Sequence, residues 1–397
     1  MRIALIWNAP YVFSKSTAPY AEYQRGFMQL GHEVRTYFQA GAEDGYPFPV
    51  ELFDGEPALC DPRFWSIRPY DVAVLFTWHR MAGVLSAMRA AGIRSVALGD
   101  SDGCVSLRAH PRATLRQRMD MQPTWRLRAG AAKLWLLDRV LRGRGWDRGL
   151  IAATEAADAF VLGASETAAI YRRFLAAQGA REAMAKVEAV PYPVAETFCT
   201  GPVTQSRPNR AIAVARWDAA QKNAALLAAA LDRAMAAGCQ TEFLIVGRHA
   251  ESRFGAVARR NPRVHLLGLQ PRDRVRELMA ESRVVLFASR WESGPIAANE
   301  MLALGGTVVG TPIPSLCSIA VGQRFGRVSR KPAGAALAEA IQSELRDWDA
   351  GRRDPQAIAA HWRPLVSPAG VCRRLLEVLE AAPVAPAAPI AMPARTA

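Results

Sequence analysis

Residues 283–311 read RVVLFASRWESGPIAANEMLALGGTVVGT, and this stretch decides the fold. The apolar run Arg283–Ala288 predicts a buried strand. Ser293-Gly294-Pro295 then opens a helix predicted over Ala297–Leu304, because proline suits the first turn of a helix. Thr307–Gly310 predicts a second strand. A strand, a helix and a parallel strand in succession form the repeating unit of a doubly wound sheet.

Two glutamates flank the start of this predicted helix. Glu292 lies in the loop, and Glu300 lies farther along the axis by about 7.5 Å at 1.5 Å per residue. The free backbone amides at a helix start favour an anion between them. Two carboxylates beside such an end match a nucleotide sugar, with one for ribose hydroxyls and one for sugar hydroxyls.

The same alternation of strands and helices extends in both directions from this stretch. In the second half, strands are predicted at Ala211–Ala215, Glu242–Val246 and Val264–Leu267. In the first half, the opening residues 1–7 and Val34–Phe38 predict strands around a helix over 20–30. Further strands are predicted at Val72–Phe76, Ser95–Leu98 and Ala159–Leu162. We therefore expect two α/β domains, each a Rossmann-like doubly wound sheet.

The positions of the prolines and the local composition indicate the domain boundaries. The joint lies near 193–208, where the prolines cluster. We predict the following division: a first domain over 1–195, a second over 196–365, a C-terminal helix over 366–380, and a disordered Pro/Ala-rich tail over 381–397.

Composition narrows the class of protein. Half of the 397 residues are apolar and 22% are charged, which is typical of a globular chain and excludes collagen, coiled coil and dominant disorder. Apolar runs are too short to span a bilayer, and the opening residues are too weakly apolar for a signal peptide. The six cysteines are scattered, which argues against a disulfide framework or a zinc site. We expect a cytoplasmic protein.

The quoted stretch resembles the signature of the retaining GT-B glycosyltransferases of family 4, E-x7-E within SxxEGxxxxxxEAMAxGxPVV. A second match lies in Ala213–Asn223, AVARWDAAQKN, which is similar to that family's G-R-x-x-x-x-K-N/G loop. Phe243–Gly247 and Val264–Gly268 resemble its base-binding strands. The order and spacing hold from about 210 to 312. The resemblance implies a GT-B fold, in which two Rossmann-like domains face each other across a cleft.

The resemblance also implies residue roles. Arg216 and Lys222 stabilise the diphosphate of the donor, and Glu292 holds the 3- and 4-hydroxyls of its sugar; these three are the expected catalytic residues. Glu300 holds the ribose. The remaining expected donor-binding residues are Gly294, Pro295, Ile296, Gly247 and Leu267. The reaction implied is transfer with retention of configuration, without a bound metal or other cofactor, because Arg216, Lys222 and the helix end neutralise the leaving group.

The first domain matches the family less well, so the acceptor side stays open. Four residues are candidates for lining it: Lys15, His79, Asp100 and Asp102. Asp100-Ser101-Asp102 also fits a D-x-D pattern that could hold a divalent cation, or a plain surface turn. For His79, a hydrogen-bonded surface histidine is the alternative.

A basic segment over 105–148 stands out from the net charge of +14. Residues 105–150 hold 11 basic and 3 acidic side chains, interleaved with tryptophan and leucine. Such an amphipathic segment predicts binding to an anionic membrane surface, at the inner face of the cell membrane. In the alternative, Leu134, Leu137 and Leu141 pack on the sheet and the arginines form a solvated face. Nucleic-acid motifs are lacking, so we expect no nucleic-acid partner.

The leading hypothesis is a retaining glycosyltransferase that moves a sugar from a nucleoside-diphosphate donor to a lipid-linked, polysaccharide or small-molecule acceptor. Two alternatives keep the fold. One is an epimerase or hydrolase of a nucleotide sugar, and the other is a non-catalytic subunit that binds a membrane or a partner. The sequence leaves open the donor base, the sugar, the acceptor and the oligomeric state.

Overall fold

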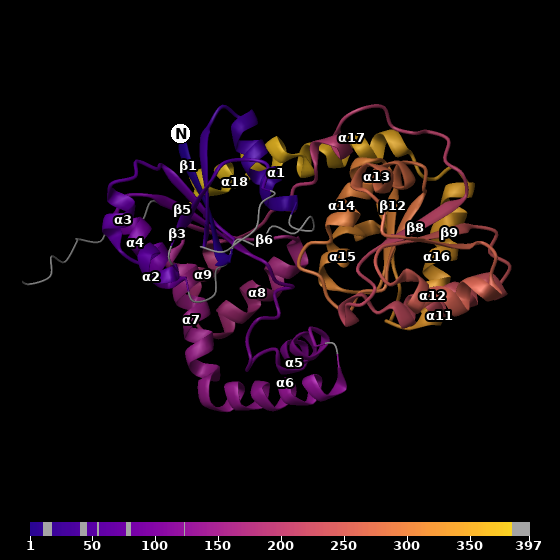
Figure 1. Ribbon diagram of the computed structural model, residues 1–397, viewed down its shortest axis with the longest axis horizontal. Coiled ribbons are helices and arrows are strands. Elements are labelled where there is room, and N and C mark those ends of the chain that lie inside the picture. Colours follow the sequence, from indigo (N-terminus) through magenta and orange to yellow (C-terminus); the bar gives the residue numbers. More distant parts are fainter. Residues whose placement is uncertain (11–17, 40–45, 54, 77–80, 123, 383–397) are drawn as a thin grey trace, which may run out of the picture.

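The computed structural model describes residues 1–10, 18–39, 46–53, 55–76, 81–122 and 124–382. Within them the chain forms two α/β domains that lie side by side, each built on a parallel sheet (Figure 1). The first sheet has the strand order β3-β2-β1-β4-β5-β6-β7, and the second has the order β10-β9-β8-β11-β12-β13. The predicted pair of Rossmann-like sheets is confirmed.

The strands match the predicted apolar runs closely. Those of the first sheet are β1 (Arg2–Pro10), β2 (Glu33–Gln39), β3 (Val50–Phe53), β4 (Val72–Leu75), β5 (Arg94–Gly99), β6 (Ala159–Leu162) and β7 (Val187–Ala189). Those of the second are β8 (Arg210–Val214), β9 (Glu242–Val246), β10 (Val264–Gly268), β11 (Val284–Phe287), β12 (Thr307–Gly310) and β13 (Gly326–Val328). Three short strands at or next to the sheet edges, β3, β7 and β13, were not predicted.

Helices cover both faces of each sheet. The first domain has α1 (Ala18–Gln29), α2 (Gly55–Leu59), α3 (Pro62–Ser66), α4 (Ala82–Ala90), α5 (Pro111–Asp120), α6 (Trp125–Leu137), the π-helical η2 (Asp138–Arg142), α7 (Gly143–Ala156), α8 (Ser165–Ala177) and α9 (Arg181–Ala185). The second has α10 (Glu196–Cys199), the 3-10 turn η3 (Ala220–Lys222), α11 (Ala224–Ala236), α12 (Ala250–Arg260), α13 (Arg272–Ala280), α14 (Ile296–Ala303), α15 (Pro314–Ile319), η4 (Val321–Gln323) and α16 (Gly334–Asp349). The chain ends in α17 (Pro355–Val366) and α18 (Pro368–Ala381).

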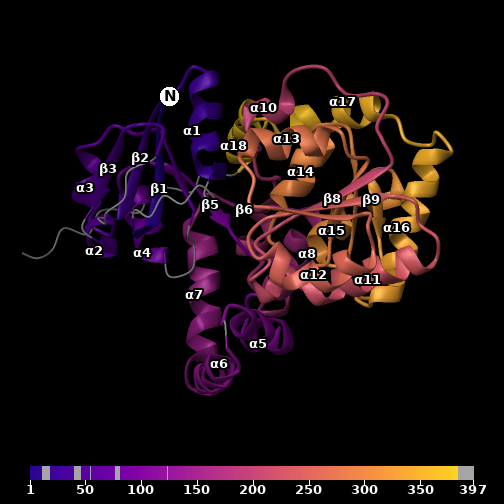
Figure 2. The same cartoon turned by 45° about the vertical axis from the view of Figure 1, so that its right-hand side comes forward.

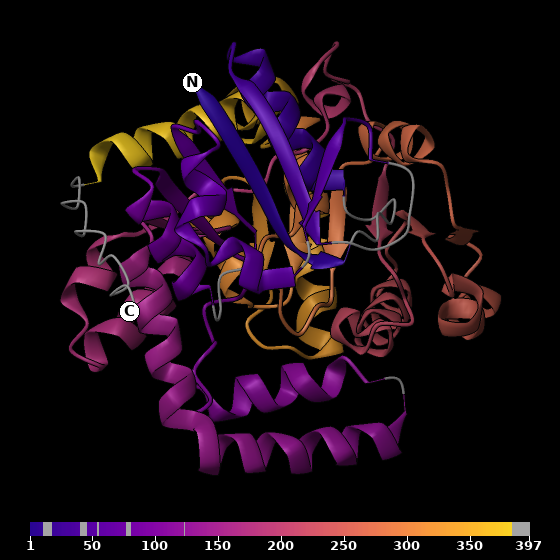
Figure 3. The same cartoon turned by 60° about the vertical axis from the view of Figure 1, so that its left-hand side comes forward.

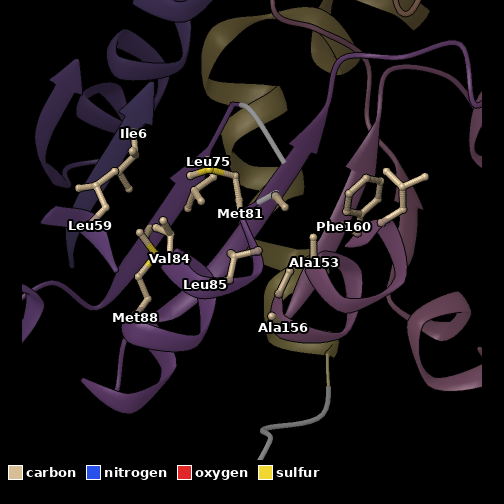
Figure 4. Close-up of a cluster of buried hydrophobic side chains, with 14 of the residues drawn as sticks. Ile6, Leu59, Leu75, Met81, Val84, Leu85, Met88, Ala153, Ala156 and Phe160 are labelled. Carbon is tan, nitrogen blue, oxygen red and sulfur yellow. The ribbon is translucent and has the colours of Figure 1, made fainter. Parts of the chain in front are cut away.

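The core of the first domain explains its continuous apolar strands. Successive residues of a strand point to opposite faces, so a sheet covered by helices on both faces needs apolar residues at every position. Leu75 and Phe160 contribute to one core together with Leu85 and Met88 of α4 (Figure 4). Val74 and its neighbours contribute to the other core, under α1 and α18.

The C-terminal helix returns to the first domain. After α17 packs on α14 of the second domain, α18 crosses over and lies along α1 (Figure 2). Val371, Cys372 and Leu375 are buried there, and the Cys372 thiol donates to the Tyr23 carbonyl at 3.2 Å. The last helix thus ties the two domains together.

The basic segment folds into a helical arm, which we define as residues 111–142 (α5, α6 and η2). The two helices pack side by side at the foot of the molecule, away from both sheets (Figure 3). Leu134, Leu137 and Leu141 are 60%, 46% and 74% exposed. The alternative in which these leucines pack on the sheet is therefore wrong, because the arm leaves the body of the domain and only Ala131 and Trp135 of α6 are buried among its described residues.

Candidate functional site

The two loops predicted to carry chemistry follow neighbouring strands. Strand β8 pairs with β11 at the centre of the second sheet, where the strand order reverses direction. In doubly wound sheets, ligands bind at the carboxyl ends of the strands beside this reversal. Arg216 and Lys222 follow β8, and Glu292 follows β11. The fold therefore places the loops that carry these three residues, up to 76 positions apart in the sequence, at the ends of two neighbouring strands.

Glu292 is buried and has three donors around its carboxylate. Lys222 Nζ lies 2.5 Å from its Oε1, and Ser289 Oγ donates to the same oxygen at 2.6 Å. Gln221 Nε2 donates to Oε2 at 3.3 Å. Of these partners only Lys222 was predicted to lie in the site. Ser289 stands three residues before Glu292 in the quoted stretch, so the family signature contained a signal for it.

The loop after β8 is held rigidly at its base. Trp217 is buried against Phe254, and its indole N–H donates to the Val246 carbonyl at 2.9 Å. Gly247 has φ 124°, and a Cβ there would lie 1.8 Å from the carbonyl oxygen of Ala215. Only glycine allows this close approach. Arg216, between these anchors, is exposed just beyond the carboxyl end of β8.

Glu300 lies inside α14, where the surrounding protein covers it. Arg272 Nη2, at the start of α13, lies 3.2 Å from Glu300 Oε1. Burial raises the pKa of Glu300 from its ordinary value of 4.5 to about 7, although the charge of Arg272 lowers it in part. Arg272 was not predicted, since nothing in the local sequence relates it to a residue 28 positions away.

Three of the other predicted donor-binding positions, Gly294, Pro295 and Ile296, lie at the start of α14. Pro295 precedes the first residue of that helix, whose leading amides have no carbonyl within the helix to bond. Gly294 packs against Tyr192, because a Cβ there would lie 2.6 Å from the ring. Ile296 and Leu267 are half-buried and pack on the same apolar core.

Of the four acceptor-side candidates, the structure describes Asp100 and Asp102. The Asp100 carboxylate is exposed and accepts from Tyr192 Oη at 3.2 Å and from Ser293 Oγ, beside Glu292. Asp102 is buried, and its Oδ1 accepts from the backbone N–H of Cys104 at 3.0 Å. Lys15 and His79 lie outside the described residues.

The Asp100 and Asp102 carboxylates accept hydrogen bonds from different donors in the described structure. Within the described part of the chain, no group of three or more His, Cys, Asp and Glu side chains could hold a metal ion. The described residues also include no helix that is both long and apolar enough to cross a membrane.

Comparison with known proteins supports the fold. Residues 208–347 match the family model described as Glycosyl transferases group 1. The chain has a GT-B fold. This GT-B chain is similar to Anabaena HepE, solved in complex with UDP, at 14% identity with a TM-score of 0.65, covering 96% of this chain and 100% of that one.

Two further solved structures share the GT-B architecture. One is WaaB, a lipopolysaccharide outer core galactosyltransferase, at 13% identity and a TM-score of 0.62, covering 96% of this chain and 99% of that chain. The other is WaaG, a glycosyltransferase involved in lipopolysaccharide biosynthesis. Its identity to this chain is 15% and the TM-score is 0.59, and the match covers 96% of this chain and 100% of that chain. No curated protein sequence matches the chain significantly. The group 1 match contains all four charged residues predicted to bind the donor: Arg216, Lys222, Glu292 and Glu300.

Proposed function

We propose that this chain is a retaining glycosyltransferase of family 4 that transfers a sugar from a nucleoside-diphosphate donor and needs no metal. One observation carries the proposal. Two ion pairs, Lys222 with Glu292 and Arg272 with Glu300, lie inside the residues that match the group 1 model, and the first of them joins the loops after the neighbouring strands β8 and β11. The structural similarity to HepE, which was solved with UDP, supports a uridine nucleotide as the first ligand to test.

Each side chain has a task that its position allows. Arg216 and Lys222 neutralise the diphosphate as the bond between sugar and phosphate breaks, together with the leading amides of α14. Glu292 accepts hydrogen bonds from the sugar hydroxyls, and Glu300 accepts them from the ribose. Because the charge on the leaving group is met by these groups, no metal is required. The acceptor is lipid-linked, a polysaccharide or a small molecule. Asp100, exposed beside Ser293, remains a candidate for lining the acceptor side of the site.

We further infer that the arm lies on an anionic membrane, at the inner face of the cell membrane. Large apolar side chains project from it without cover: Trp125, Leu127, Leu134, Leu136, Leu137, Val140 and Leu141. Basic side chains are exposed among them: Arg126, Lys133, Arg139 and Arg142. Apolar groups enter the headgroup region while arginines pair with lipid phosphates, which fits peripheral binding. A lipid-linked acceptor would then reach the site from the surface on which the enzyme sits.

Thermal unfolding with nucleotides is the first test of the donor site. Unfolding is measured with UDP, GDP, ADP and CMP and their sugar conjugates, each with and without EDTA. A ligand at 100 times its Kd adds about 2.7 kcal/mol of stability. We expect one nucleotide to raise the unfolding temperature. EDTA should not change this rise, and Glu300→Ala should abolish it. An EDTA-sensitive shift would contradict metal independence.

Product analysis separates the proposed reaction from its alternatives. Incubation of the purified protein with the nucleotide sugar that binds should release neither free sugar nor an epimer, whereas an added acceptor should become glycosylated with release of the nucleoside diphosphate. Rapid release of either product would favour the hydrolase or epimerase. A protein that binds none of the nucleotides would favour the non-catalytic subunit.

A further inference from the structure

Two carboxylates of the first domain contact the loop that carries Glu292. Ser293 donates to Asp100, which follows β5. Arg290 Nη1 lies 2.8 Å from Oδ1 of Asp120, the last residue of α5. The predicted donor loop is thus held by two carboxylates from the other domain, one of which belongs to the helical arm.

The position of the Asp120 carboxylate is unfavourable for the stability of its own helix. A carboxylate in the last turn lies near the negative end of the helix dipole, and the repulsion between the two destabilises the helix end. Its side chain is also only 4% exposed, and a buried carboxylate is costly unless it is paired. The Arg290 guanidinium supplies that pairing from the second domain. The stability of this end of α5 therefore depends on where Arg290 lies.

The contact continues from Arg290 into the cationic loop. The Arg290 backbone N–H donates to the Gln221 carbonyl at 2.8 Å, and Gln221 Nε2 donates to the Trp291 carbonyl at 2.8 Å. Lys222 is the next residue after Gln221, and α5 also packs against η3, which contains both. A shift of Arg290 would move Gln221 and with it the Lys222–Glu292 pair.

We propose that Asp120 and Arg290 are positioning residues: their ion pair couples the helical arm to the Lys222–Glu292 pair, so that the arm's orientation sets the geometry of the donor site. The proposal rests on the function proposed above, because Lys222 and Glu292 are taken to bind the donor. By linkage, whatever stabilises the arm in this orientation tightens nucleotide binding, and nucleotide stabilises the arm by the same factor.

Hydrogen–deuterium exchange tests the coupling without any ligand. We expect Asp120→Asn to speed the exchange of amides at 289–294 and 221–223 at least fivefold, although the substitution lies in the other domain. Ser318→Ala is the matched control, since it removes another contact between the domains, the bond from the Glu166 N–H to Ser318 Oγ at 2.9 Å. Unchanged exchange of the two segments in Asp120→Asn would overturn the proposal. An equal rise in exchange in Ser318→Ala would also overturn it.

A double-mutant cycle on UDP affinity tests the consequence for the site. Asp120→Asn and Arg290→Gln should each weaken UDP binding by about tenfold, and the double variant should be no weaker than either one. A pair with only a structural role would lower Tm and leave the UDP Kd unchanged, which would overturn the positioning role. Arg290→Lys keeps the charge and provides a second variant if Arg290→Gln folds poorly; it should retain most of the affinity.

The two tests separate this inference from the function on which it rests. If the wild-type chain bound no nucleotide, the donor site would fail as a proposal and the positioning role would fail with it. The exchange experiment would still report whether the arm and the 289–294 loop are mechanically coupled.

Discussion

Lys222 Nζ lies 2.5 Å from Glu292 Oε1, so the two residues predicted to bind different parts of the donor are bonded to each other. In this arrangement each side chain neutralises its partner's charge. A diphosphate would compete with Glu292 for Lys222, and sugar hydroxyls would compete with Lys222 for Glu292. If both residues bind the donor as proposed, the pair would therefore oppose the binding of a nucleotide that lacks the sugar.

Removing the Glu292 charge should consequently have opposite effects on binding and turnover. We expect Glu292→Gln to tighten UDP binding by about fivefold, because a partly exposed ion pair contributes about 1 kcal/mol. The same change should lower turnover of the sugar nucleotide, since the amide accepts sugar hydroxyls less well. Calorimetric titration with UDP and a transfer assay measure the two effects. Glu277→Gln, which removes an exposed ion pair with Arg274, is the control and should change neither; weaker UDP binding in Glu292→Gln would contradict the competition.

The raised pKa of Glu300 predicts a pH dependence of nucleotide binding. The carboxyl group has a pKa of about 7 in the folded chain, so it is charged above that pH and protonated below it. Ribose hydroxyls donate best to the charged form, and UDP affinity should fall as the pH drops from 8 to 6. The terminal phosphate of the nucleotide also titrates, with a second pKa near 6. In Glu300→Gln only the phosphate titrates, so UDP affinity should change less with pH than in the wild type. Parallel pH profiles of the two proteins would rule out Glu300 as the group that titrates.

Arg216 should matter more for turnover than for folding. Its side chain is exposed, so Arg216→Ala should change the free energy of unfolding by less than about 0.5 kcal/mol. Loss of one group that stabilises the leaving diphosphate should lower turnover several hundredfold, an effect of about 3–4 kcal/mol. Arg248→Ala, in the loop after the adjacent strand β9, provides an exposed arginine for comparison. Equal losses in both variants would mean that the general positive charge is what matters.

The exposed leucines of the arm predict a membrane-binding defect without a folding defect. Leu137→Asp with Leu141→Asp should weaken binding to vesicles of phosphatidylglycerol and phosphatidylcholine at least tenfold, since burying each leucine contributes about 1.5–3 kcal/mol. Leu269→Asp is the control, because Leu269 is 67% exposed on the second domain. Vesicle flotation measures binding and thermal unfolding measures stability. Equal binding by the arm variant and the wild type would argue against the membrane surface.

Much of the fold could be predicted because its signals are local. A parallel strand covered on both faces must be apolar throughout, and β6, β9 and β12 have the bounds that their apolar runs predicted. The strands β3, β7 and β13 escaped prediction because short strands near a sheet edge need no such run. The loop positions of Glu292 and Arg216 were likewise predictable, since each follows a recognisable strand.

The sequence by itself determined two parallel-sheet domains, their order, and the loops in which the charged residues of the candidate site lie, because each depends on neighbours within a few positions. Only the tertiary structure decided which charges meet. It paired Lys222 with Glu292, Arg272 with Glu300 and Arg290 with Asp120, across 70, 28 and 170 positions of chain. It also exposed the arm's leucines, whose spacing suited a packed helix equally well. A helix's apolar spacing is an internal property, whereas its burial depends on whether another element lies against it.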